Sequence, residues 1–300
     1  MTTLTEPRAL PVSRRRRLSA ALFRNPRVRL ALLLVLPLAW LLVVYFAALF
    51  SLLVTSLFGV DEFTGAVVHT FTLQNFKDVF TDPAYIRVTL RTVGIAATVT
   101  LICAVLAVPM SFFMAKVVRS ALARRALLAL MITPLWASYL VKVYAWQAMV
   151  QPRNGVLAWL LAPIGRGGPG YGITAVILTL SYMWLPYMVL PVYAGLDRLP
   201  DSYLEASADL GARPVRTFRR IVLPLLWPSI VAGSIFTFSL SLGDFITVQV
   251  VGAQTQMLGN VVWLNYAADL PFAAAVAMIP VIIMLVYLGL ARRTGALDNL

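Results

Sequence analysis

Charged residues are scarce in this 300-residue sequence, and acidic residues are the scarcest of them. Charged side chains make up 12% of the chain, apolar residues make up 60%, and the mean hydropathy is +0.84. Ordinary soluble domains carry about 25% charged residues. The composition therefore excludes a soluble globular protein and predicts a protein that lives in a lipid bilayer.

Cysteine and histidine are almost absent, because Cys103 and His69 are the only residues of their kinds. A single cysteine excludes an internal disulfide and a cysteine metal cluster. A lone histidine has no nearby partner with which to hold a metal ion. We therefore expect no metal site in this chain.

The sequence also lacks the groups that hydrolysis needs. The glycine-rich segment GRGGPG at 165–170 is not followed by a Lys-Ser/Thr pair, so it does not match a phosphate-binding loop and is expected to form an external turn. No paired catalytic groups occur at a useful spacing. We expect a non-catalytic chain without a cofactor of its own, so any energy source must lie in another protein.

Long apolar runs are what this sequence has in abundance. About 20 apolar residues in a helix cross a bilayer. Candidate spans occur near 30–58, 92–115, 127–150, 173–196, 223–250 and 273–291. Residues 30–300 are therefore predicted to form one all-α, polytopic membrane domain of six transmembrane helices.

Basic residues are distributed unevenly between these runs. If the N-terminus is cytoplasmic, 19 of the 25 Lys and Arg residues lie on the cytoplasmic side, eight of them before Leu30. The positive-inside rule explains this pattern, and with it the net charge of +13, better than a nucleic-acid partner does. Residues 1–29 are predicted to be a basic cytoplasmic segment, in preference to a DNA-binding arm or a twin-arginine export signal. We expect an uncleaved first helix and both termini in the cytoplasm.

The longest internal cytoplasmic loop, 197–222, is unusually polar for this chain. Ser202 and Glu205 have capping-box spacing, and Gly211 can end a helix of about nine residues in a left-handed turn. Pro214 suits the first turn of a second short helix, which would end before Pro224 opens the next span. Helices this short are marginal alone in water, so they need a packing partner. That partner is either the chain's own bundle or a separate protein.

The residue types in this loop, and the spacings between them, match a known motif. Glu205-Ala206-Ser207, Gly211, Ile221 and Leu223-Pro224 occur at spacings that resemble the EAA loop of permease subunits in ATP-binding-cassette (ABC) importers, with Ser207 in place of the second alanine. The resemblance implies a type I ABC-importer permease (MetI-like) fold and a loop that docks on a partner ATPase. The residues it assigns to that contact are Glu205, Ala206, Ser207, Asp209, Gly211, Ala212, Arg213 and Pro214.

Three further stretches, 71–92, 240–252 and 257–266, resemble the spermidine/putrescine permease branch, and most of all its first permease subunit. Phe245, Val248 and Ala253 depart from the GDYITP-LVGG pattern of that branch. The resemblance implies a polyamine substrate, with sulfate or ferric iron as alternatives. It also implies a bacterial inner-membrane complex with a second, similar permease, an external solute-binding protein and two ATPase subunits that bind ATP and Mg²⁺.

Asp244 is the one acidic residue within a predicted span. A carboxylate there normally faces protein or a water-filled cavity. It could contact a cationic ligand, or it could cap a helix broken after Gly243. Aromatic residues that could offer cation–π faces to such a ligand, or form an interfacial belt instead, are Tyr139, Tyr144, Trp146, Trp184 and Tyr187.

Small residues recur every four positions on the fifth predicted span, at Ser229, Gly233 and Thr237. This spacing favours close helix packing, which we expect to be against a partner permease. Two other functions stay open at this point. One is a secondary carrier driven by an ion gradient, with Asp244 and Lys142 as a relay. The other is a membrane-bound scaffold or sensor without a transported ligand.

Overall fold

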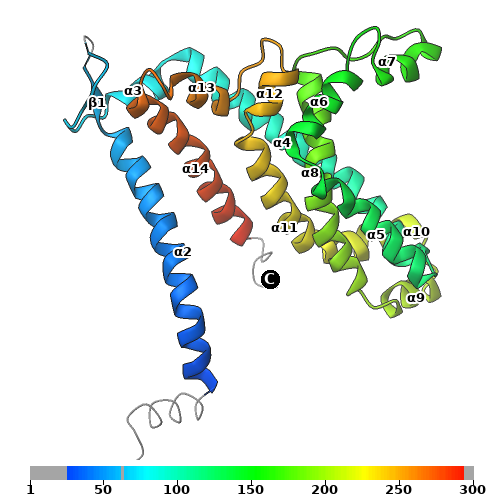
Figure 1. Ribbon diagram of the computed structural model, residues 1–300. Helices are drawn as coiled ribbons and strands as arrows, with labels where there is room; N and C mark the ends of the chain where they lie inside the picture. Colours follow the sequence, from blue (N-terminus) through cyan, green and yellow to red (C-terminus); the bar gives the residue numbers. More distant parts are fainter. Residues whose placement is uncertain (1–25, 62–63, 294–300) are drawn as a thin grey trace, which may run out of the picture. The chain divides into compact units, whose positions relative to one another are not determined.

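The computed structural model describes residues 26–61 and 64–293, so most of the predicted basic segment at 1–29 lies outside the described residues. The chain divides into two compact units, Met1–Val54 and Thr55–Leu300. The first unit contributes helix α2 (Pro26–Ser56), labelled in Figure 1. The most apolar stretch within Leu33–Ser56 has no residue buried inside the chain, as expected of a lipid-facing span.

A short connection follows α2 along the chain. Strands β1 (Gly59–Val60) and β2 (Val67–Val68) form an antiparallel hairpin in which Gly59 pairs with Val68. Helix α3 (Gln74–Thr81) comes next. The all-α prediction missed this hairpin, because two-residue strands leave no periodic signal in a sequence.

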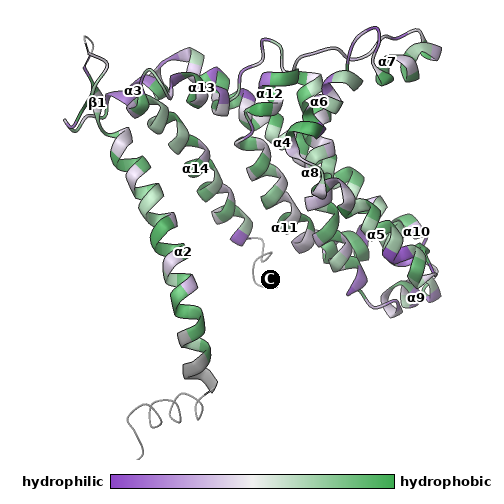
Figure 2. Cartoon of the chain, viewed as in Figure 1, coloured by the Kyte–Doolittle hydropathy of each residue, from purple (hydrophilic) through white to green (hydrophobic). Residues whose placement is uncertain are grey.

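Three long helices form the core of the second unit: α4 (Pro83–Phe112), α8 (Ile173–Asp197) and α11 (Leu223–Leu242). Figure 2 shows that apolar residues dominate these helices. Side chains with no exposed surface, such as Val99, Leu180 and Met188, fill the space between them. A π turn, η1 (Phe113–Val117), continues α4.

The second span begins earlier than the predicted residue 92. Asp82 caps α4 by accepting a hydrogen bond from the Ala84 N–H at 2.7 Å, and Pro83 occupies the first helical position. Arg87 and Arg91 then lie inside the helix, and their charge is what hid this first part of it from a hydropathy reading.

The third span is broken rather than straight. Helices α5 (Ala121–Trp136) and α6 (Tyr139–Met149) meet at 96°, with Ala137 and Ser138 in extended conformation between them. The prediction of one helix across 127–150 is therefore wrong. Hydropathy carries no information about the direction of the helix axis. Two apolar helices that are separated by only two residues therefore look like one helix in the sequence.

A connection rich in turns leads from α6 to α8. It contains α7 (Val156–Leu161) and the 3₁₀ turn η2 (Ala162–Ile164). Gly165 and Gly170 adopt left-handed conformations with φ of 69° and 71°, and the Gly168 N–H donates to the Pro152 carbonyl at 2.9 Å. The GRGGPG segment is therefore a turn, as predicted.

The fifth span also differs from its prediction. Helix α11 ends at Leu242 and not at 250, and the short helix α12 (Ile246–Val251) follows after a break. Helices α13 (Leu258–Asn265) and α14 (Leu270–Arg293) complete the described chain, and α14 contains the predicted sixth span. Within the described residues, five helices are long and apolar enough to cross a membrane, and the bent pair α5–α6 makes six if it is counted as one span.

The small-residue stripe of α11 packs against α8 of the same chain. A Cβ atom added to Gly233 would lie 3.1 Å from Cα of Met188, and one added to Gly195 of α8 would lie 2.9 Å from Cβ of Ser229. Thr237 is fully buried. The stripe thus brings two backbones together inside this subunit, so the expected packing of these residues against a partner permease is corrected.

Candidate functional site

The loop after α8 contains helix α9 (Ser202–Asp209), whose base is held by an ion pair. Lys116 at the end of η1 donates to the Asp201 carboxylate at 2.7 Å and to the Leu199 carbonyl at 2.6 Å. The hydrogen bond from Lys116 and its positive charge lower the pKa of Asp201. Asp201 occupies the N-cap position and makes no side-chain capping bond, so the predicted capping box of Ser202 and Glu205 is wrong.

The far end of α9 closes as the sequence predicts. Gly211 has a left-handed φ of 73°. Its N–H donates to the Ala208 carbonyl at 2.8 Å, and the Ala212 N–H donates to the Ser207 carbonyl at 3.1 Å. These two bonds make a Schellman motif, which needs a residue that tolerates positive φ.

The second loop helix is not a separate element. Helix α10 (Pro214–Thr217) starts at Pro214, as predicted, and continues through the π turn η3 (Phe218–Val222) into α11. The prediction that it ends before Pro224 is wrong. Pro224 has no N–H to donate, and the wider π turn just before it keeps the helix continuous across that gap.

Six of the eight residues assigned to docking are exposed, and one of the other two is buried. Ser207 is 5% exposed, and its Oγ lies 2.7 Å from Oγ1 of Thr217. It therefore ties α9 to α10 instead of facing outward, which corrects its assignment as a docking contact. Ala212 is half-buried, and the exposed residues of the set are Glu205, Ala206, Asp209, Gly211, Arg213 and Pro214.

Sequence reasoning missed the apolar part of this loop surface. Leu210 is 88% exposed, Val215 is 78% exposed and Tyr203 is 51% exposed. Large apolar side chains this exposed in a polar loop mark a surface that contacts another molecule. Their signal was present in the sequence, since Leu210 and Val215 lie beside Gly211 and Pro214.

A second group of polar residues gathers at the break between α11 and α12. Asp244 is 6% exposed, and its carboxylate accepts hydrogen bonds from the Thr247 N–H at 2.9 Å and the Thr247 hydroxyl at 3.2 Å. The Tyr139 hydroxyl, from the start of α6, donates to the same carboxylate and lies 2.8 Å from Oγ1 of Thr247. Asp244 therefore holds the first turn of α12 through the Thr247 N–H, as the capping interpretation predicts, although Phe245 occupies the N-cap position, and Asp244 also lines a cavity.

That cavity has a volume of about 250 Å³. Among the described residues, Asp244 forms no ion pair, so the proposed relay with Lys142 has no structural support. Trp184 is 8% exposed, and its indole N–H has no hydrogen-bond partner within the described chain. The lining residues are Tyr139, Trp184, Leu240, Gly243, Asp244, Phe245 and Ile246.

The aromatic residues predicted for a substrate path separate into two groups. The Tyr139 and Trp184 rings lie 6.2 Å apart, and Tyr187 continues from Trp184 at 5.9 Å. Tyr144 is 56% exposed, and Trp146 packs on Tyr182 at 5.4 Å, away from the residues that line the cavity. The structure therefore brings Tyr139, Trp184 and Tyr187 together but not Tyr144 or Trp146.

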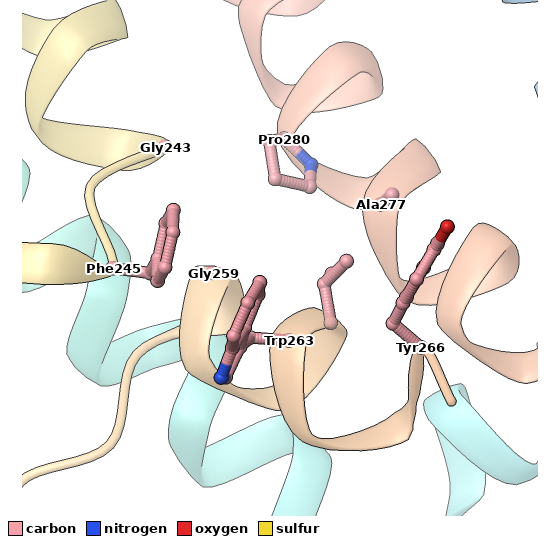
Figure 3. Close-up of a pocket in the computed structure, with 8 residues that line it drawn as sticks. Gly243, Phe245, Gly259, Trp263, Tyr266, Ala277 and Pro280 are labelled. Carbon is pink, nitrogen blue, oxygen red and sulfur yellow. The ribbon is translucent and has the colours of Figure 1, made fainter. Parts of the chain in front are cut away.

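A larger apolar cavity of about 390 Å³ shares the lining residues Gly243 and Phe245 with the polar one (Figure 3). The Phe245 and Trp263 rings stack at 5.4 Å with an interplanar angle of 18°. Asn260 secures the break by donating to the Phe245 carbonyl at 3.0 Å. The residues around this cavity are Gly243, Phe245, Gly259, Val262, Trp263, Tyr266, Ala277 and Pro280, of which sequence reasoning singled out none for a binding role.

Comparison with known protein families identifies this arrangement. Residues 107–294 match the family described as the binding-protein-dependent transport system inner membrane component. The chain belongs to this permease family. The matched region contains the α9 loop, the broken third span and both cavities, so the family and MetI-like fold predicted from the EAA motif are confirmed.

Individual relatives of this permease agree with the family. It is 42% identical over 301 residues to the inner membrane ABC transporter permease protein YdcU of Escherichia coli K12, covering 95% of each chain. It is 32% identical over 266 residues to the spermidine/putrescine transport system permease protein PotB of the same organism, covering 87% of this chain and 95% of PotB.

Solved structures show the same fold at lower identity. A bacterial ABC transporter involved in the import of the acidic polysaccharide alginate matches with a TM-score of 0.69 at 16% identity, over 92% of this chain and 99% of the other. The MetNI methionine ABC transporter matches with a TM-score of 0.54 at 18% identity, over 69% of this chain and 93% of the other. The permease is thus a multi-pass membrane protein of the inner-membrane ABC-importer type.

Proposed function

We propose that this permease forms half of the translocation pathway of an ATP-driven importer. In this proposal a second homologous permease supplies the other half, two cytoplasmic ATPase subunits bind ATP and Mg²⁺, and an external solute-binding protein delivers the ligand. The names of the relatives and the exposed EAA loop support this assembly. Both termini and the loop face the cytoplasm, an orientation supported by the distribution of basic residues.

The observation that carries the proposal is the continuity between the loop and the membrane helix. Helix α9 is tied to α10 through Ser207 and Thr217, and Pro214–Leu242 is a single helical span of 29 residues. At about 1.5 Å per residue this span is about 44 Å long. A push by the ATPases on α9 is therefore carried along one rigid element to the break at Gly243, beside Asp244.

The ligand we propose is a polyamine such as putrescine or spermidine. A buried carboxylate without a cationic partner in the described chain attracts an amine, and the Tyr139 and Trp184 rings beside it offer cation–π faces. The same carboxylate opposes sulfate, because it would repel an anion. The relationship to PotB supports the polyamine choice over ferric iron.

Proteoliposome uptake tests this function. The complex purified with the tagged chain is loaded with ATP inside the vesicles, and uptake of labelled putrescine and spermidine is measured with the binding protein outside. We expect uptake that requires ATP and that Glu205→Ala abolishes. A secondary carrier would instead transport without ATP and stop when an uncoupler is added, and a scaffold or sensor would transport nothing.

A further inference from the structure

A basic cavity lies at the base of the loop, outside the translocation site. It has a volume of about 290 Å³ and is lined by Arg213, Val215, Arg216, Arg219 and Arg220. All four arginines are exposed. The two ion pairs of the described residues involve Lys116 and Arg124, so none of these four guanidinium groups has a carboxylate partner there.

The position of this cavity along the helix places it at the membrane surface. Helix α11 has 20 residues from Leu223 to Leu242, and about 20 helical residues cross the hydrocarbon core of about 30 Å. Pro214–Leu242 is one continuous helix of 29 residues, so about nine of its residues extend beyond the hydrocarbon. Counted from Leu223, Arg219 and Arg220 lie about 4.5–6 Å along the axis, within the headgroup layer, whereas Arg213 and Arg216 lie about 10–15 Å along it, on the water side of that layer.

Large apolar side chains on the helix are exposed where the helix enters the hydrocarbon core of the bilayer. Leu225 and Trp227 are each 51% exposed, and tryptophan is enriched at the boundary between headgroups and acyl chains. The cavity thus opens beside a surface that lipid can reach. A soluble partner would meet the arginines and Val215, whereas a phospholipid would meet the arginines with its phosphate and Leu225 and Trp227 with its chains.

We propose that the cavity formed by Arg213, Val215, Arg216, Arg219 and Arg220 binds the phosphate of an anionic phospholipid headgroup. Guanidinium groups form paired hydrogen bonds to phosphate oxygens, and basic clusters next to a membrane helix attract anionic lipids. The site is independent of the transported ligand, and it shares Arg213 and Val215 with the exposed surface of the loop described above. Its occupant holds the lower end of the long helix at a fixed depth in the bilayer.

Lipid retention by the full-length chain in nanodiscs tests this site without any partner protein. The probe is phosphatidylglycerol in a phosphatidylcholine background, counted by native mass spectrometry. The variant is Arg216→Gln/Arg219→Gln/Arg220→Gln. The matched control is Arg119→Gln/Arg292→Gln/Arg293→Gln, which removes the same charge at three exposed arginines outside the cavity. We expect at least about tenfold weaker phosphatidylglycerol binding in the variant and less than about twofold change in the control.

A lysine variant distinguishes loss of the lipid site from misfolding. Arg216→Lys/Arg219→Lys/Arg220→Lys keeps the charge that orients the helix but removes the paired donors, and we expect it to bind phosphatidylglycerol more weakly than the wild type. Equal losses in the variant and the control would overturn the proposal, as would wild-type retention by the lysine variant. Displacement of the lipid by millimolar inorganic phosphate would identify free phosphate as the ligand and would also overturn it. If the Arg216→Gln/Arg219→Gln/Arg220→Gln variant retained the lipid normally but no longer bound the ATPase, the arginines would belong to the docking surface, and this result would also overturn the proposal.

Discussion

At the scale of single residues, the side chains near the two helix breaks are the ones on which the proposed transport function can be tested. Asp244 combines two features, because it accepts the Thr247 N–H in the first turn of α12 and lines the neighbouring cavity. The amide of asparagine retains an oxygen acceptor for the cap but carries no charge. The two features can therefore be separated by one substitution.

Asp244→Asn should lower putrescine uptake at least about tenfold while changing the free energy of unfolding by less than about 1 kcal/mol, because the amide oxygen keeps the bond from the Thr247 N–H and the Tyr139 and Thr247 hydroxyls can rotate to accept from the amide NH₂. Uptake of labelled putrescine and thermal unfolding in detergent measure the two effects. Asp269→Asn is the matched control, since Asp269 caps α14 through the Phe272 N–H at 2.9 Å and lines neither cavity. Unchanged uptake by Asp244→Asn would remove Asp244 from the substrate path.

Ala253 is the one described residue other than glycine with positive φ, at 51°. It stands where the related sequence pattern has glycine, and an alanine in this region costs about 1–2 kcal/mol. We expect Ala253→Gly to raise the free energy of unfolding by about 0.5–1 kcal/mol, after the entropy that glycine loses on folding is subtracted. Ala274→Gly inside α14 should have the opposite sign in the same thermal unfolding measurement. If Ala253→Gly lowered the free energy of unfolding, the backbone at Ala253 would not be strained.

At the scale of elements, the sequence predicts helices better than it predicts their joints. The Schellman turn at Gly211 and the helix start at Pro214 followed from residue types that allow few other conformations. The bend at Ala137 and Ser138 did not, because no residue there requires it locally and the contact of Tyr139 with Asp244, 105 residues away, accompanies it. The inward direction of Ser207 was likewise a tertiary fact, set by Thr217.

Gly211→Pro should abolish ATP-driven uptake, because proline removes the N–H that donates to Ala208 and cannot adopt the left-handed φ of 73°. Gly211→Asn is the matched control, since asparagine tolerates that conformation, and it should retain most activity. Uptake and ATPase stimulation by the binding protein are measured in proteoliposomes. Full activity of the proline variant would mean that the shape of this turn does not matter for coupling.

The contact between α11 and α8 offers a second pair of glycine substitutions. Gly233→Ala places a methyl group 2.6 Å from the Met188 sulfur and should destabilise the protein by about 1–3 kcal/mol. Gly289→Ala meets no atom within 4 Å and should be neutral or slightly stabilising, because alanine is the better helix former. Thermal unfolding of both variants measures the difference. Equal midpoints would show that the two helices do not approach this closely.

At the scale of the whole molecule, composition and apolar runs were enough to predict a six-span membrane protein, and the motif in the loop was enough to predict its permease family. The two cavities could not be predicted, because each joins residues from several helices. Trp263 reaches the apolar cavity from α13, and Trp184 reaches the polar one from α8. Such long-range assemblies depend on how breaks redirect helices.

Orientation is testable on the intact protein. Cys103 is the only cysteine and is fully buried. Labelling by a thiol reagent therefore shows whether an introduced cysteine is accessible from the side on which the reagent is added. We expect Leu210→Cys to react with a membrane-impermeant maleimide in inside-out vesicles only, and Phe71→Cys in spheroplasts only, because these exposed residues are predicted on opposite sides. The unaltered chain is the control. The reverse labelling pattern would invert the topology and place the α9 loop out of reach of any cytoplasmic ATPase.

Gly243 and Phe245 border both the polar and the apolar cavity, so one stretch of backbone is a wall common to two chambers. Because the 29-residue helix ends at these residues, we expect any displacement of its end to change the volumes of both cavities together.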